Sequence, residues 1–236
     1  MDEDDDLVEA EKAELTNKIH ILELNLFILG NVRMDVMDVL QLPPNLHTLQ
    51  LDYYKCNRFP KWITSFNYLR ELSIRKCRNC SSLPLLGILP MLEELSVYHM
   101  ENLEWVGNEF LGIKENVDEP SSSKFPMLKK LCFDHCNKWE EWKDISEEVK
   151  NSFSVMPNLC RLQITNCGRL KSLPHRLLRL TSSLQTLYIE ECQFLTLRYK
   201  KSWGPNDNHL ISHIPDLSIV FESKYYGYYD YMYGYY

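Results

Sequence analysis

The sequence predicts an α/β repeat protein, a curved solenoid with a parallel β-sheet on its concave face and an irregular, short helical convex side. The main observation is a recurring spacing, in which an apolar residue is followed three and five positions later by two more. Each copy is typical of a short strand that turns its apolar side chains inward. Such a strand cannot bury that face alone and must stack on its neighbours. Copies of the spacing begin at Ile19, Leu46, Leu69, Leu92, Leu128, Leu159 and Leu184, with a weaker copy at Ile214.

The second observation is the interval between copies. The shorter intervals, 23 to 27 residues by these positions, match the period of leucine-rich repeats, which is about 20–29 residues. Two longer intervals contain polar segments at 112–123 and 140–151, and we expect these to bulge out as loops while the strands keep their register. Proline residues between the strands disfavour long helices on the return path. We therefore predict a leucine-rich-repeat solenoid of about eight repeats over residues 18–224, whose first strand is aligned on Ile19, Leu22 and Leu24.

The two ends of the chain lie outside this spacing. Residues 1–17 form an acidic N-terminal segment in which a short helix could form. Residues 225–236 are rich in tyrosine and lack aliphatic residues, so we predict a disordered low-complexity tail, with an adhesive tyrosine surface as the alternative.

Composition and charge exclude several classes of partner. The net charge is −7, and much of it comes from the five consecutive acidic residues at 2–6. The basic residues are scattered and form no stripe for phosphates, so we expect no nucleic acid partner. No segment approaches the ~20 apolar residues of a spanning helix, so we expect no membrane partner. Met1 is followed by acidic residues and not by a secretory signal. We expect a cytoplasmic protein that could also enter the nucleus, with its cysteines reduced.

The cysteines show a regular phase. Cys77, Cys136, Cys167 and Cys192 each follow the last apolar strand residue by three positions. Leucine-rich repeats place Asn or Cys there, and we interpret the four as a buried structural ladder. A zinc site built from Cys77, Cys80, Cys132 and Cys136 is the alternative, because zinc needs four converging ligands. A nucleophilic pair of Cys136 with His135 is disfavoured, because neighbouring residues of a strand face opposite sides.

The residues between the inward-facing positions are expected on the concave face. They form a polar field of mixed sign that contains Tyr and Arg, which are common in protein interfaces. A solvated sheet face without a partner is the alternative. The predicted partner-binding residues are Thr48, Gln50, Asp52, Glu71, Ser73, Arg75, Glu94, Ser96, Tyr98, Lys130, Asp134, Arg161, Gln163, Thr165, Thr186, Tyr188 and Glu190, with Cys132 on the same face.

Trp139 and Trp142 lie three residues apart, and Trp105 precedes them in the chain. A tryptophan pair at this spacing could form a binding patch. We interpret the pair as core residues that pack beneath a long loop.

Several phrases of the sequence resemble one protein family. They are LQLPPNL at 40–46, FPKWI at 59–63, CRNC at 77–80, WVGNEF at 105–110 and WEEW at 139–142. Together with the repeat spacing, the chain is similar, from about residue 9 to residue 224, to the C-terminal leucine-rich region of plant disease resistance proteins of the coiled-coil, nucleotide-binding, leucine-rich-repeat class.

The resemblance implies a role in pathogen recognition. In this class the repeats contact a pathogen effector or a guarded host protein, and they also pack against the nucleotide-binding module. The repeats of this class catalyse no covalent reaction and bind no cofactor, so we do not expect an enzyme. The chain contains no nucleotide-binding module of that class, so nucleotide switching is not implied, and such a module could be a partner in cis or in trans.

Two further expectations concern the chain by itself. A stand-alone leucine-rich-repeat adaptor or scaffold and a truncated relic are the alternatives to a recognition module. Solenoids need polar caps at their ends, and the first coil, at about 19–29, would present an apolar edge. We therefore predict self-association through this uncapped N-terminal edge.

Overall fold

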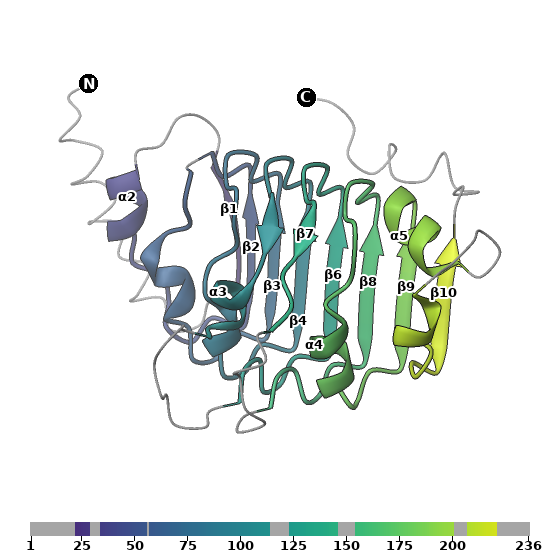
Figure 1. Cartoon of the computed structure of the whole chain (residues 1–236). Helices are drawn as coiled ribbons and strands as arrows, with labels where there is room; N and C mark the ends of the chain where they lie inside the picture. Colours follow the sequence, from purple (N-terminus) through teal and green to yellow (C-terminus); the bar gives the residue numbers. More distant parts are fainter. Residues whose placement is uncertain are drawn as a thin grey trace.

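The computed structural model describes residues 22–28, 34–55, 57–113, 123–145, 154–200 and 207–220. The predicted acidic N-terminal segment and tyrosine-rich tail lie outside these residues. One parallel sheet of eight strands runs through the described part in the order β1-β2-β3-β4-β6-β8-β9-β10, which confirms the leucine-rich-repeat solenoid (Figure 1). The strands are β1 Glu23–Phe27, β2 Thr48–Asp52, β3 Glu71–Arg75, β4 Glu94–Tyr98, β6 Lys130–Asp134, β8 Arg161–Thr165, β9 Thr186–Glu190 and β10 Asp216–Val220.

The strands pair in register, so residues at equivalent positions of successive repeats are neighbours. Leu49 of β2 pairs with Leu72 of β3, which pairs with Leu95 of β4. These three leucines are at most 1% exposed, and the fourth residue of each strand is buried in the same way. Stacking of equivalent apolar residues gives one continuous core along the solenoid. A single repeat cannot bury its apolar face alone, so it needs this stacking.

Backbone hydrogen bonds join the strands at their entry points. The amides of Arg70 and Glu71 both donate to the carbonyl oxygen of His47, at 2.7 and 3.0 Å. The same pair of bonds recurs one repeat later, from Glu93 and Glu94 to the carbonyl of Arg70. The buried backbone at the start of each strand is therefore satisfied by the preceding repeat.

The predicted register of the first strand is wrong by two residues. Leu24 pairs with Leu49 and Leu26 with Leu51, whereas the prediction put Leu22 and Leu24 in those positions. Apolar residues alternate through this segment, so both alignments fit the spacing. The observed alignment brings Ile28 to the buried end of the strand, where its amide donates to the carbonyl of Asp52 at 3.1 Å. The weaker last copy has the predicted register, because Leu217 and Ile219 pair with Leu187 and Ile189 of β9.

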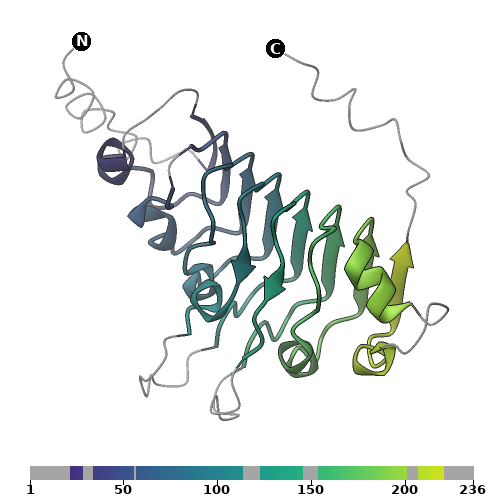
Figure 2. The same cartoon turned by 45° about the horizontal axis from the view of Figure 1, so that its top comes forward.

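The return segments are short helices and turns, as predicted, and they lie on the side of the coil opposite the large sheet (Figure 2). A second, two-stranded parallel sheet, which the sequence did not suggest, joins two of them. No helix in the described part is long and apolar enough to cross a membrane. The elements are α2 Met34–Val39, η2 Lys61–Thr64, η3 Leu86–Ile88, β5 Trp105–Val106, α3 Asn108–Leu111, β7 Glu141–Trp142, α4 His175–Leu180, α5 Gln193–Tyr199 and η5 Asn208–Leu210.

An aromatic cluster forms part of the core. Trp139 is 0% exposed and packs its ring 4.6 Å from Phe133 and 5.4 Å from Trp142, measured between ring centroids. Its indole N–H donates to the carbonyl of Glu141 at 2.9 Å. Trp105 is half-buried, with the ammonium of Lys143 5.7 Å from its ring centroid. The tryptophan pair is therefore part of the core, and the binding-patch alternative is wrong for Trp139 and Trp142.

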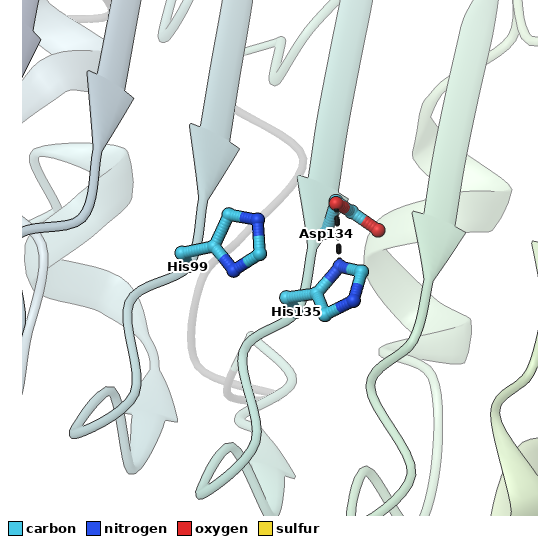
Figure 3. Close-up of side chains that lie close together, drawn as sticks. All are labelled: His99, Asp134 and His135. Atoms are coloured by element: carbon cyan, nitrogen blue, oxygen red, sulfur yellow. Dashed lines mark hydrogen bonds and ion pairs between the residues drawn. The ribbon is translucent and has the colours of Figure 1, made fainter. Parts of the chain in front are cut away.

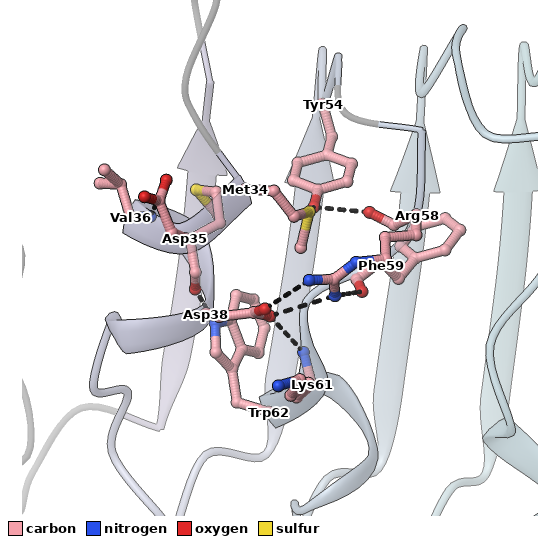
Figure 4. Close-up of polar contacts among 10 residues, drawn as sticks. Met34, Asp35, Val36, Asp38, Tyr54, Arg58, Phe59, Lys61 and Trp62 are labelled. Atoms are coloured by element: carbon pink, nitrogen blue, oxygen red, sulfur yellow. Dashed lines mark hydrogen bonds and ion pairs between the residues drawn. The ribbon is translucent and has the colours of Figure 1, made fainter.

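A polar cluster joins α2 to η2 near the N-terminal end of the solenoid (Figure 4). The guanidinium of Arg58 contacts the carboxylate of Asp38 at 2.7 Å, and the amide of Lys61 donates to the same carboxylate at 3.0 Å. The indole of Trp62 donates to the carbonyl of Met37 at 2.6 Å. These contacts hold the pKa of Asp38 below its ordinary value, chiefly through the hydrogen bond from Arg58.

Candidate functional site

Alternation along the strands puts the first, third and fifth residue of each strand on the face opposite the core. The structure places every predicted concave residue at one of these positions in β2, β3, β4, β6, β8 or β9. Asp52 and Thr165 are buried even so, whereas the other predicted residues are half-buried or exposed. Their role in binding a partner stays a prediction.

Ion pairs join charged residues of neighbouring repeats on this face and just beside it. Lys130 contacts Glu94 at 2.5 Å on the first row of the face. Just before the strands, Glu93 contacts both Arg70 at 2.8 Å and Lys129 at 2.5 Å. Exposed ion pairs of this kind contribute about 0–1 kcal/mol each. The face is thus polar and of mixed charge, with more acidic than basic residues.

A shallow hollow of about 190 Å³ lies on the face over β2, β3 and β4. Ser73 and Ser96 are neighbours across β3 and β4, and their small side chains line it. Arg75 and Tyr98 also line it, with the guanidinium 5.4 Å from the tyrosine ring centroid and its Nε donating to the Ser73 hydroxyl at 3.0 Å. Burial raises the pKa of the Tyr98 phenol, which therefore carries its proton at neutral pH. The hollow thus offers a cation, an aromatic ring and hydroxyl groups in one place.

Asp134, at the end of β6, is the centre of a hydrogen-bonded group. Its carboxylate accepts bonds from the Thr165 hydroxyl at 2.6 Å and the Asn166 amide at 2.9 Å, and its other oxygen lies 2.7 Å from Nδ1 of His135. Burial raises the pKa of Asp134, but these hydrogen bonds outweigh burial, so the pKa lies below its ordinary value. The group fixes the rim of the face where β6 and β8 end.

A row of residues in the left-handed backbone conformation follows the strands, and the sequence analysis missed it. Each has φ between 51° and 58°, and each amide donates to the carbonyl of the last residue of the next strand. Four of these residues directly precede the ladder cysteines in the sequence. None of them is a glycine, the residue that usually marks this backbone conformation. The row consists of Tyr53, Lys76, His99, His135, Asn166 and Glu191.

The first and last strands extend the face beyond the predicted residues. Phe27, the fifth residue of β1, is 58% exposed, and Leu22 just before that strand is 42% exposed. The error in register hid Phe27 from the sequence analysis. These side chains give the N-terminal edge an apolar character, and self-association through it stays a prediction.

All four ladder cysteines are buried. The thiol of Cys192 donates to the carbonyl of Ile164 at 3.5 Å, and burial raises the pKa of Cys77 and Cys167 well above the ordinary value. Within the described residues, the structure does not gather Cys77, Cys80, Cys132 and Cys136 into a metal-binding group. Cys136 is buried with its thiol donating to the carbonyl oxygen of Asp134 at 3.8 Å, and among the described residues it makes no hydrogen bond with His135, so the two do not form a nucleophilic pair.

This geometry defines a leucine-rich-repeat protein with an open polar face. Residues 2–100 match the family described as R13L1/DRL21 leucine-rich repeats, a range that includes β1 to β4. The match and the relatives below confirm the resemblance to the leucine-rich-repeat region of plant disease resistance proteins.

Three named relatives make the resemblance specific. Over 207 residues the chain is 30% identical to disease resistance RPP13-like protein 1 of Arabidopsis thaliana, an alignment covering 80% of this chain and 19% of that protein. It is 33% identical over 186 residues to disease resistance protein RF9 of the same plant, with 75% and 14% covered. It is 26% identical over 186 residues to disease resistance protein RGA4 of Solanum bulbocastanum, with 64% and 19% covered. The chain thus spans about a fifth or less of the length of these relatives.

Proposed function

We propose that this chain is a protein-recognition module of plant innate immunity, which binds a pathogen effector or a guarded host protein through the concave face of its sheet. The observation that carries the proposal is the hollow over β2, β3 and β4, where Arg75 and Tyr98 stand beside small seryl side chains. The similarity to plant disease resistance proteins supports the biological setting.

The residue types of the hollow fit a protein partner. Tyr and Arg are enriched among the residues that dominate binding energy in protein interfaces. The Arg75 guanidinium is already held by Ser73 and the Tyr98 ring, so less side-chain entropy is lost when a partner binds. Truncation of a central Arg or Tyr in such a position costs about 2 kcal/mol or more, which is about thirtyfold in affinity.

The proposed module recognises and does not catalyse. Its buried thiols carry raised pKa values, so they are poor nucleophiles. In the proposed setting it acts in the cytoplasm, and nucleotide-dependent switching belongs to a separate module that contacts the repeats in cis or in trans.

The test is affinity capture from pathogen-challenged leaf tissue with the chain as bait. Wild type is compared with Arg75→Ala and Tyr98→Ala, which change only the hollow. Arg169→Ala and Tyr68→Ala are matched controls, because these exposed residues lie outside the strands. We expect a partner that is lost with both hollow variants and retained by both controls. Capture that is equally insensitive to all four substitutions would rule out the hollow as the binding surface.

A further inference from the structure

Two histidines of the left-handed row lie side by side at one rim of the sheet. His99 follows β4 and His135 follows β6, and these strands are neighbours in the sheet. The amide of His99 donates to the carbonyl of Asp134 at 2.9 Å, and that of His135 donates to the carbonyl of Thr165 at 3.2 Å. The backbone therefore holds both imidazoles at fixed points on the same rim.

The three side chains lie close together at the ends of β4 and β6, and the dashed line in Figure 3 marks the contact between His135 and the Asp134 carboxylate. The imidazole rings stack with centroids 4.4 Å apart, and Nδ1 of His135 lies 2.7 Å from a carboxylate oxygen of Asp134. One donor atom from each of the three residues lies within 4.8 Å of the others, and within the described residues this is the only such group of three or more. All three side chains are half-buried, so the group is open to solvent on one side.

We propose that His99, His135 and Asp134 bind one Zn²⁺ ion at this rim of the sheet. Imidazole and carboxylate are zinc ligands, and neutral imidazole selects against Mg²⁺ and Ca²⁺, which take oxygen ligands. The ion replaces the proton between His135 and Asp134, and that proton moves to Nε2 of the same ring, which keeps the imidazole neutral. Three protein ligands leave one tetrahedral position for water.

Only small side-chain movements are needed to form the site. Zinc holds nitrogen and oxygen ligands at about 2.0–2.2 Å, so two of its ligands lie roughly 3.3 Å apart in a tetrahedron. The donor atoms now lie within 4.8 Å of one another, so the longest separation must close by up to about 1.5 Å, while the 2.7 Å contact between His135 and Asp134 must open by about 0.6 Å. Rotations about χ angles of half-buried side chains allow both movements. Thr165 and Asn166 continue to hold the other carboxylate oxygen, and they act as the outer partners that orient a metal ligand.

The proposal is independent of whether the concave face binds a partner, and its test needs no partner. The full-length chain, with its affinity tag removed, is titrated with Zn²⁺ by calorimetry and with Co²⁺ by visible absorption. Four-coordinate Co²⁺ gives visible d–d bands, and thiolate ligands add a near-ultraviolet charge-transfer band. We expect one ion per chain, with visible bands and no thiolate band.

The key variants are His99→Asn and His135→Asn, because Asn166 already occupies the equivalent left-handed position in the next repeat. Asparagine tolerates that conformation, so both variants should fold. We expect each to weaken Zn²⁺ binding about tenfold to a hundredfold or more. His209→Asn and His213→Asn, at exposed histidines far along the chain, should bind as wild type does.

The outcomes separate the possibilities cleanly. Loss of binding in the two rim variants alone, with the expected cobalt spectrum, supports the site. The proposal is overturned if Zn²⁺ does not bind, if the rim variants bind it as tightly as the controls, or if the cobalt spectrum shows thiolate ligands.

Discussion

Truncation of Trp139 to alanine should strongly destabilise the solenoid. Its side chain is 0% exposed and touches Phe133 and Trp142 in the aromatic cluster. A buried aromatic residue removes about 150–250 Å² from water, which at about 25 cal/mol per Å² is worth roughly 4–6 kcal/mol. Part of this remains with alanine, and substitutions of Trp by Ala in protein cores cost about 3–5 kcal/mol. For a chain of this size, that lowers the thermal midpoint by roughly 6–20 °C.

The assay is unfolding by heat and by urea, followed by circular dichroism. Trp105→Ala is the matched control, because Trp105 is half-buried and its contact with Lys143 is worth only about 1 kcal/mol. If Trp139→Ala lowers the midpoint no more than Trp105→Ala does, Trp139 does not pack in the core, and the interpretation of the tryptophan pair fails.

Three further predictions concern a close contact, an ion pair and the N-terminal edge. A Cβ added at Gly87 would lie 2.0 Å from a backbone carbonyl oxygen of α3, so Gly87→Ala should lower stability in urea by about 2 kcal/mol or more. Arg58 lowers the pKa of Asp38 below its ordinary value of 3.8, so ionised Asp38 stabilises the fold above that pH and does so less as the pH falls below it. In urea unfolding, Asp38→Asn should therefore be less stable than wild type at pH 7. The difference between the two proteins should close at low pH. Replacing exposed Phe27 by lysine should reduce the mass of self-associated species in light scattering.

Each of these predictions has a control and a contrary result. Gly168→Ala adds a methyl group with no atom within 4 Å, and Gly87→Ala should be clearly the more harmful of the two. A difference between Asp38→Asn and wild type that persists unchanged down to low pH would contradict the role of the ion pair. Phe194→Lys, at an exposed site on α5, is the control for Phe27→Lys, and equal effects of the two would argue against the N-terminal edge.

The strands could be predicted because their physical cause is local. Apolar residues at the second and fourth strand positions, with a leucine or isoleucine three residues before the second, recur wherever the chain forms the large sheet, as at Leu46, Leu49 and Leu51. The same rule failed at β1, because the alternating run that contains Leu22, Leu24 and Leu26 satisfies two alignments. The two alignments differ in which residue of β2 each leucine of β1 pairs with, and only the packing of the assembled sheet decides between them.

The concave face followed from strand alternation, but its details did not. That Arg75 stacks on Tyr98 depends on side-chain rotamers across two strands, which the spacing does not encode. His99 and His135 are separated in the chain by a long insertion, so their proximity required the in-register pairing of β4 with β6. The left-handed backbone conformation places both rings on one rim. It could not be predicted, because neither position is a glycine, the residue that usually indicates this conformation.

Hydroxyl-radical footprinting of the chain with and without its captured partner is the most direct test of binding through the concave face. Tyr98 and Tyr188 report on that face, while Tyr68 and Phe194 are exposed aromatic residues outside the strands of the sheet. We predict that the partner lowers oxidation of Tyr98 and Tyr188 and leaves the other two unchanged. Protection of Tyr68 or Phe194, with Tyr98 and Tyr188 still oxidised as in the free chain, would contradict the account.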